Sequence, residues 1–82
     1  METTIMAITI DPRSVHAKEV QTILTKYGCI IKTRIGLHEL SQDSCSEQGL
    51  IILHINSNLD KVKVFENDLL DIEGVKVKYM IL

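Results

Sequence analysis

The chain has 82 residues, of which 45% are hydrophobic and 24% charged, and its formal net charge at pH 7 is −2. This length and composition predict a single small globular domain spanning residues 1–82, and the scattered lysines and arginines argue against direct binding of nucleic acid. No apolar run approaches the ~20 residues of a membrane-spanning helix, and the first residues lack the pattern of a secretory signal, so we expect a cytoplasmic protein.

The first half of the chain predicts a strand, a helix and a second strand. Residues 3–10, TTIMAITI, are β-branched and apolar, as in a strand. Asp11 suits a helix cap and Pro12 a first turn, and apolar residues recur at helical spacing between residues 15 and 28. Residues 29–37 alternate, which predicts a half-buried strand with charged side chains on its other face. The face predicted to be buried carries Cys29, Ile31, Thr33, Ile35 and Leu37.

The second half predicts a strand, a helix and a final strand. Residues 50–56, LIILHIN, are apolar on both faces, residues 57–74 keep a helical stripe, and residues 75–82 alternate with lysines on one side. The resulting order, βαββαβ, predicts an α+β ferredoxin-like sandwich: a four-stranded antiparallel sheet with two helices on one face. The first and third strands would be central in this sheet, and the charged second and fourth strands would be its edges.

The face of this sheet without helices is expected to be apolar at its centre. Leu50, Ile52 and His54 would point to it, and the first strand offers two largely apolar sets, at positions 5, 7 and 9 and at positions 6, 8 and 10. Proteins in water rarely leave such a patch uncovered. We therefore expect a homo-oligomer, a dimer or tetramer formed through the sheet, with Leu50, Ile52 and His54 in the interface.

The chain contains three segments that carry a family resemblance: ILTKYGCIIKTRIGL, GLIILHI and IEGVKVKYMIL. They resemble the ACT-like family of iron-only hydrogenase system regulators, which are small ferredoxin-like proteins of anaerobic bacteria. The match extends along nearly the whole chain, and YG-II--R-GL and GVKVK carry most of its specificity. The resemblance implies an ACT-like fold, an oligomer and a regulatory role, but it supplies no known ligand.

A polar stretch at residues 36–49, GLHELSQDSCSEQG, offers candidate metal ligands. His38 and Cys45 suit nickel or zinc, and His54 lies on the same predicted face. A more distant likeness, to the regulatory domain of the nickel-responsive repressor, implies a metal site in which His38 and Cys45 stand near two of its four ligands, with Gly36 in place of a third. The alternative is a solvated hairpin loop made of ordinary turn residues.

The loop after the first strand is the other candidate site. ACT-like modules bind small molecules near this loop, and Asp11 and Arg13 could meet the amine and carboxylate of an amino acid. The signature glycine of such loops is missing, however, and a helix cap accounts for Asp11 without a ligand. His16 is expected at the edge of the helix stripe, with its ring partly exposed.

The sequence offers no pattern of catalytic residues, so we expect no enzyme activity. Acylphosphatases share the predicted fold, but their glycine-rich phosphate cradle has no counterpart in DPRSVH. The leading hypothesis is a non-enzymatic regulatory module that binds a small ligand or metal at an oligomer interface. The alternative is a ligand-free structural or interaction subunit that binds a protein partner.

Overall fold

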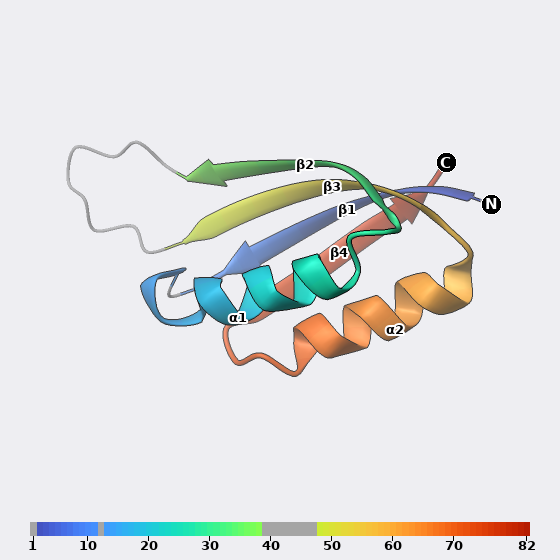
Figure 1. Ribbon diagram of the computed structural model, residues 1–82. Coiled ribbons are helices and arrows are strands. Elements are labelled where there is room, and N and C mark those ends of the chain that lie inside the picture. The colour runs from blue at the N-terminus through green and yellow to red at the C-terminus, as the bar shows by residue number, and fades with distance from the viewer. Residues whose placement is uncertain (1, 12, 39–47) are drawn as a thin grey trace.

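The computed structural model describes residues 2–11, 13–38 and 48–82. Its elements follow in the order β1 (Glu2–Ile10), α1 (Arg13–Lys26), β2 (Ile31–His38), β3 (Gly49–Ser57), α2 (Leu59–Leu70) and β4 (Val75–Ile81). The strands form one sheet of order β2-β3-β1-β4 in which every neighbouring pair is antiparallel. Both helices lie against the same side of this sheet (Figure 1). The ferredoxin-like α+β fold is therefore confirmed, with β1 and β3 in the centre.

The two helices owe their positions to apolar stripes and, in α2, to a cap. The side chain of Asn58 accepts a hydrogen bond of 2.9 Å from the backbone N–H of Lys61, which satisfies one of the free donors at the start of α2. Helix α2 buries Val62, Phe65 and Leu69, whose spacing keeps them on one face. None of the helices among the described residues is long and apolar enough to cross a membrane.

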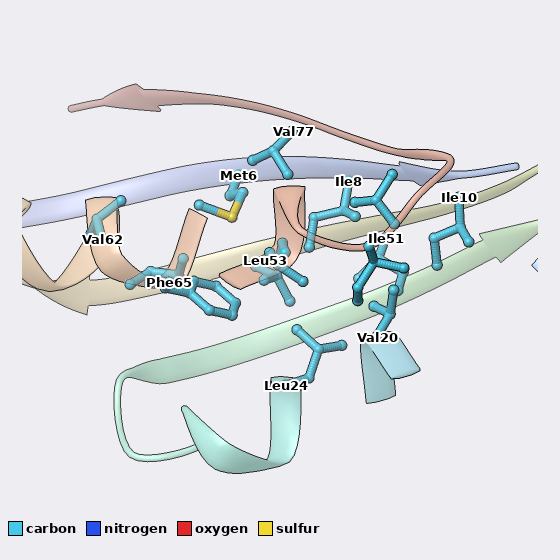
Figure 2. Packing of buried hydrophobic residues seen from close by; sticks show 14 residues of the cluster. Met6, Ile8, Ile10, Val20, Leu24, Ile51, Leu53, Val62, Phe65 and Val77 are labelled. Carbon is cyan, nitrogen blue, oxygen red and sulfur yellow. The ribbon is translucent and has the colours of Figure 1, made fainter. Parts of the chain in front are cut away.

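The core lies between the sheet and the two helices (Figure 2). On β1 the buried set is Met6, Ile8 and Ile10, which decides between the two apolar faces that the sequence left open. Alternate residues of β3 join them, and the helices contribute side chains such as Leu24 and Phe65. The core is thus aliphatic apart from one phenylalanine, with Tyr27 and Tyr79 packed at its margin.

Strand β2 departs from the predicted alternation because its pairing with β3 contains a β-bulge. Ile31 pairs with Ile55, but Thr33 pairs with His54, so the register shifts around Lys32. An extra residue in one strand moves the side chains beyond it to the opposite face. The prediction that Thr33 and Ile35 share the buried face with Ile31 is therefore wrong.

Cys29 also differs from its predicted position. We expected this thiol to face the core, but it lies in the turn between α1 and β2 and is exposed. The strand begins only at Ile31, because the backbone N–H of Ile30 still bonds to the carbonyl of Tyr27 in the turn that ends the helix. Cys29 is therefore not a core residue.

A close contact joins the turn after β1 to the turn before β4. The backbone N–H of Asp11 donates a hydrogen bond of 2.9 Å to the carbonyl of Gly74. Gly74 has a φ of +84°, a conformation that favours glycine, and a Cβ at this position would overlap the carbonyl oxygen of Asp11. The two turns are therefore fastened through the backbone.

Candidate functional site

The face of the sheet that carries no helix, called the open sheet face from here on, is the main candidate site. The pairing registers place alternate residues of all four strands on it. These residues include Ile5, Ala7 and Thr9 of β1, Leu50, Ile52 and His54 of β3, Thr33 and Ile35 of β2, and Lys76, Lys78 and Met80 of β4.

The centre of the open sheet face is apolar. Ile35, Ile52 and Ala7 form one row across three strands, because each is the register partner of the next. Ile35 is 50% exposed and Met80, which pairs with Ile5, is 59% exposed. A hollow of about 320 Å³ lies beside this row, lined mainly by apolar side chains of β1, β3 and β4. Such a surface is suited to contact with another apolar surface.

The charged groups of the open sheet face lie to one side. Lys76 and Lys78 stand on the edge strand β4, opposite Thr9 and Ala7. Among the positions that the registers assign to this face in the described strands, none is acidic. The margin along β4 is therefore cationic, while the centre is uncharged.

The three residues predicted for the oligomer interface all lie on this face. Leu50, Ile52 and His54 are half-buried and alternate with the buried residues of β3, as expected. His54 stands between Thr33 and Ile5 in its row across the sheet. A histidine in such a row adds hydrogen-bonding groups to an otherwise apolar surface.

Of the predicted metal ligands, His38 and His54 lie far apart along the sheet of one protomer. His38 pairs with Gly49, and His54 is five positions further along β3, which is about 16 Å at the usual rise of a strand. The backbone positions therefore do not bring these two residues together. Cys45 and the side chain of His38 lie outside the described residues, and no group of three or more metal-ligating side chains occurs within the described parts of the chain.

The predicted ligand loop is anchored at Asp11. Asp11 is exposed, but its backbone N–H is held by Gly74. Arg13 begins α1, and its side chain lies outside the described residues, as does Pro12, which was predicted for the first turn of the helix. His16 lies next to Gly74 and places Nδ1 3.4 Å from Glu19 Oε1, with its side chain 17% exposed. This matches the expected position at the edge of the helix stripe.

Sequence reasoning missed a polar cluster that joins the two helices. The hydroxyl of Tyr27 donates a hydrogen bond of 2.5 Å to Asp68 Oδ2, and Lys26 Nζ lies 3.5 Å from the same oxygen. The bond from Tyr27, and secondarily the charge of Lys26, hold the pKa of the Asp68 carboxyl below its ordinary value. The bond to Asp68 likewise raises the pKa of Tyr27.

The same tyrosine also packs on the core. Its ring centroid lies 4.8 Å from that of Phe65, with the rings inclined at 46°. Tyr27 is visible in the sequence as the end of a helical stripe, but no sequence signal marks Asp68, 41 residues later, as its partner. The cluster is structural in character, because it holds the end of α1 against α2.

Comparison with known proteins agrees with the fold. No protein-family model and no curated protein sequence matches the chain. Among solved structures, an uncharacterised protein of Thermotoga maritima, TM1266, has a TM-score of 0.84 and 22% sequence identity, and the match covers 98% of this chain and 95% of that one. At this identity the likeness shows a common fold and nothing further.

Two other similar structures are of proteins named for a function. A nitrogen regulatory PII-like protein from Thiomonas intermedia K12, bound to ADP, AMP and bicarbonate, has a TM-score of 0.61 and 13% identity, covering 100% of this chain and 91% of that one. A formyltetrahydrofolate deformylase from Pseudomonas putida has a TM-score of 0.62 and 13% identity, but the match covers 95% of this chain and only 28% of that one. The ferredoxin-like fold thus occurs in a regulatory protein and within a larger enzyme.

Proposed function

We propose that this chain is a non-enzymatic ACT-like regulatory module, associated with an iron-only hydrogenase system, that works as a homo-oligomer. The observation that carries the proposal is the open sheet face, whose centre is apolar and uncovered in the single chain. The resemblance of three segments to iron-only hydrogenase system regulators supports the association with such a system. The nitrogen regulatory PII-like structure supports a regulatory use of this fold.

A second copy of the chain is the proposed cover of the open sheet face. Burying aliphatic side chains contributes about 25 cal/mol for each Å² removed from water, so the row through Ile52 gives association a driving force. Two sheets pack face to face when their inner faces are apolar. Because Lys76 and Lys78 lie along β4 rather than in the centre, two copies can bury their centres while both lysine margins stay in water.

Regulation would act through this assembly. A ligand or metal ion that binds the oligomer and the separate chains with different affinity shifts the equilibrium between them. In the proposed module, Asp11 and Arg13, or His38 and Cys45, contribute to such a site. The resulting change in assembly would be the signal that a partner reads.

The mass of the protein in solution tests the proposal. Sedimentation at micromolar concentration is expected to give a dimer or tetramer, and elemental analysis of the same sample shows whether nickel or zinc accompanies it. Thermal melting with added nickel, zinc or amino acids is expected to show stabilisation by the ligand that binds the native state. A monomer with no ligand response would contradict the proposal.

The second candidate is a ligand-free interaction subunit. The observation that favours it is the cationic margin along Lys76 and Lys78, which complements a partner with acidic groups beside an apolar surface. Co-purification with one partner protein, together with unchanged melting in the ligand series, would support this candidate over the first.

A further inference from the structure

A second hollow lies away from the centre of the open sheet face, where the edge strand β2 begins. Its volume is about 370 Å³, and it is formed by the last turns of α1, the following turn and the first residues of β2. This volume is within the range of small-molecule sites. Its lining consists of Leu24, Thr25, Gly28, Ile31, Lys32, Thr33 and Arg34.

The floor of this hollow is apolar. Leu24 is buried in the core, and Ile31 packs against the core while remaining partly exposed. The β-bulge around Lys32 occurs at the same place, and bulges are often found where a strand re-aims its side chains beside a site. Gly28 supplies no side chain to this part of the lining. The hollow can therefore accept an apolar group as well as a polar one.

The charge of the hollow has one sign. Lys32 and Arg34 both line it, and among the described residues no acidic side chain does. Arg34 Nη2 donates a hydrogen bond to Gln21 Oε1 on α1, which holds the guanidinium beside the hollow. A guanidinium has five N–H donors, so this bond leaves it able to donate to an anion as well. Thr25 and Thr33 also line the hollow, and the hydroxyl of Thr25 donates a hydrogen bond to the carbonyl of Gln21.

We infer that this hollow binds a small organic anion, in which a phosphate or carboxylate group meets Lys32 and Arg34 and a short apolar part lies on Leu24 and Ile31. Charge-assisted bonds from lysine and arginine are the usual means of holding such groups. The inference does not depend on the proposed function, because only Thr33 is shared with the open sheet face. If the protein proved to be a monomer, the inferred anion site would be unaffected. If no anion bound, the proposed oligomer would be unaffected.

The experiment is an NMR titration of the full chain with three aromatic probes of similar size. Phenyl phosphate and phenylacetate represent the two anionic groups, and benzyl alcohol is the neutral control. The anions are expected to shift the backbone amides of Gly28 and residues 31–34 in a saturable way, and the better of the two identifies the preferred group. Benzyl alcohol is expected to bind at least about fivefold more weakly, because it lacks the charge that Lys32 and Arg34 recognise.

Charge-removing variants locate the site. Lys32→Gln and Arg34→Gln are each expected to weaken binding of the preferred anion by about five- to tenfold. Arg34→Lys, which keeps the charge but loses the planar fork, should fall between Arg34→Gln and the parent protein. Lys76→Gln removes the same charge from the open sheet face and should bind as the parent does. Lys32→Gln alters an exposed side chain, so it tests the inference even if an Arg34 variant folds poorly.

Two results would overturn the inference. One is an equal loss of affinity in Lys76→Gln and Lys32→Gln, which would mean that the anions respond only to total charge. The other is a pattern of shifts spread over all lysine and arginine positions, or no saturable shift at all. Either would show that Lys32 and Arg34 serve only to keep the edge strand from pairing with other chains.

Discussion

At Gly74 the backbone takes a φ of +84°, and a Cβ would overlap the carbonyl oxygen of Asp11. Gly74→Ala is therefore expected to lower the free energy of unfolding by more than about 2 kcal/mol, since it adds both backbone strain and a clash with another turn. Urea unfolding followed by circular dichroism measures this loss.

The matched control for this prediction is Gly36→Ala in β2. Nothing lies within 4 Å of a Cβ at Gly36, and its φ is not in the left-handed region. Alanine there should leave stability within about 0.5 kcal/mol of the parent. Equal losses at both glycines would mean that the contact between Gly74 and Asp11 is unimportant.

The pair formed by Tyr27 and Asp68 predicts a dependence of stability on pH. Because the pKa of Asp68 is lowered in the folded state from its ordinary 3.8, the stability that it contributes is present above that value and is lost as pH falls through the folded-state pKa. Tyr27→Phe removes the main cause. The variant should be less stable than the parent at pH 7, and the difference between the two proteins should shrink only as pH falls below the ordinary value of 3.8.

Urea unfolding across pH 2.5–7 would measure this difference, with the range chosen to span the ordinary carboxyl value. Tyr79→Phe removes a hydroxyl from β4 instead and provides the control. A difference between Tyr27→Phe and the parent that stays constant over the whole range would show that the hydrogen bond does not act through ionised Asp68.

At the scale of elements, the start of α2 depends on a side chain that satisfies backbone donors. Asn58→Ala removes the acceptor for the N–H of Lys61 and is expected to cost about 1 kcal/mol of unfolding free energy. Asn58→Asp, which keeps an acceptor and suits the positive end of the helix, should retain or slightly raise the parental stability. Unfolding in urea compares the three, and an alanine variant as stable as the parent would mean that water caps the helix equally well.

The order of elements was predictable because each carries a regular pattern. The stripe of α2 predicts both its type and the face that it buries, and the structure agrees, as it does with the faces predicted for β3. The buried face of β1 was not predictable, because both of its faces are apolar. The bulge in β2 was not predictable either, since residues 29–37 alternate without interruption and no residue marks Lys32 as the extra one.

At the scale of the whole molecule, the open sheet face predicts how the protein assembles. Ile52→Lys places a charge at the centre of the apolar row and is expected to convert the proposed oligomer to monomers, because a lysine in the proposed interface would be buried without a partner. Sedimentation at micromolar concentration measures the mass, and a melting curve checks that the variant is folded.

Val64→Lys is the matched control for the assembly prediction. Val64 lies on α2, on the other side of the sheet, and is 54% exposed. The same substitution there should leave the mass unchanged. If both variants dissociate, or neither does, the open sheet face is not the surface through which the chains associate.

The residues of the candidate site were predictable where one strand places them. They were not predictable where contacts between different elements place them. Leu50, Ile52 and His54 were placed correctly on one face because successive side chains of a single strand point to opposite faces. The hollow beside Lys32 requires α1 and β2 to be set at a particular separation, and the bond between Tyr27 and Asp68 joins segments 41 residues apart. Such juxtapositions arise from tertiary packing and leave no local pattern in the sequence.

The central position of β1 also affects how the chain folds during synthesis. During synthesis β1 leaves the ribosome before the other strands of the sheet, yet its two neighbours are β3 and β4, which come from the second half of this sequence. Until then a strand that is apolar on both faces has nothing to pair with on either edge. Sheets that pair strands distant in the sequence fold slowly, and their folding intermediates expose apolar surface that is prone to aggregation. The central strand of the finished sheet is thus the strand whose apolar side chains stay exposed for the longest time during synthesis.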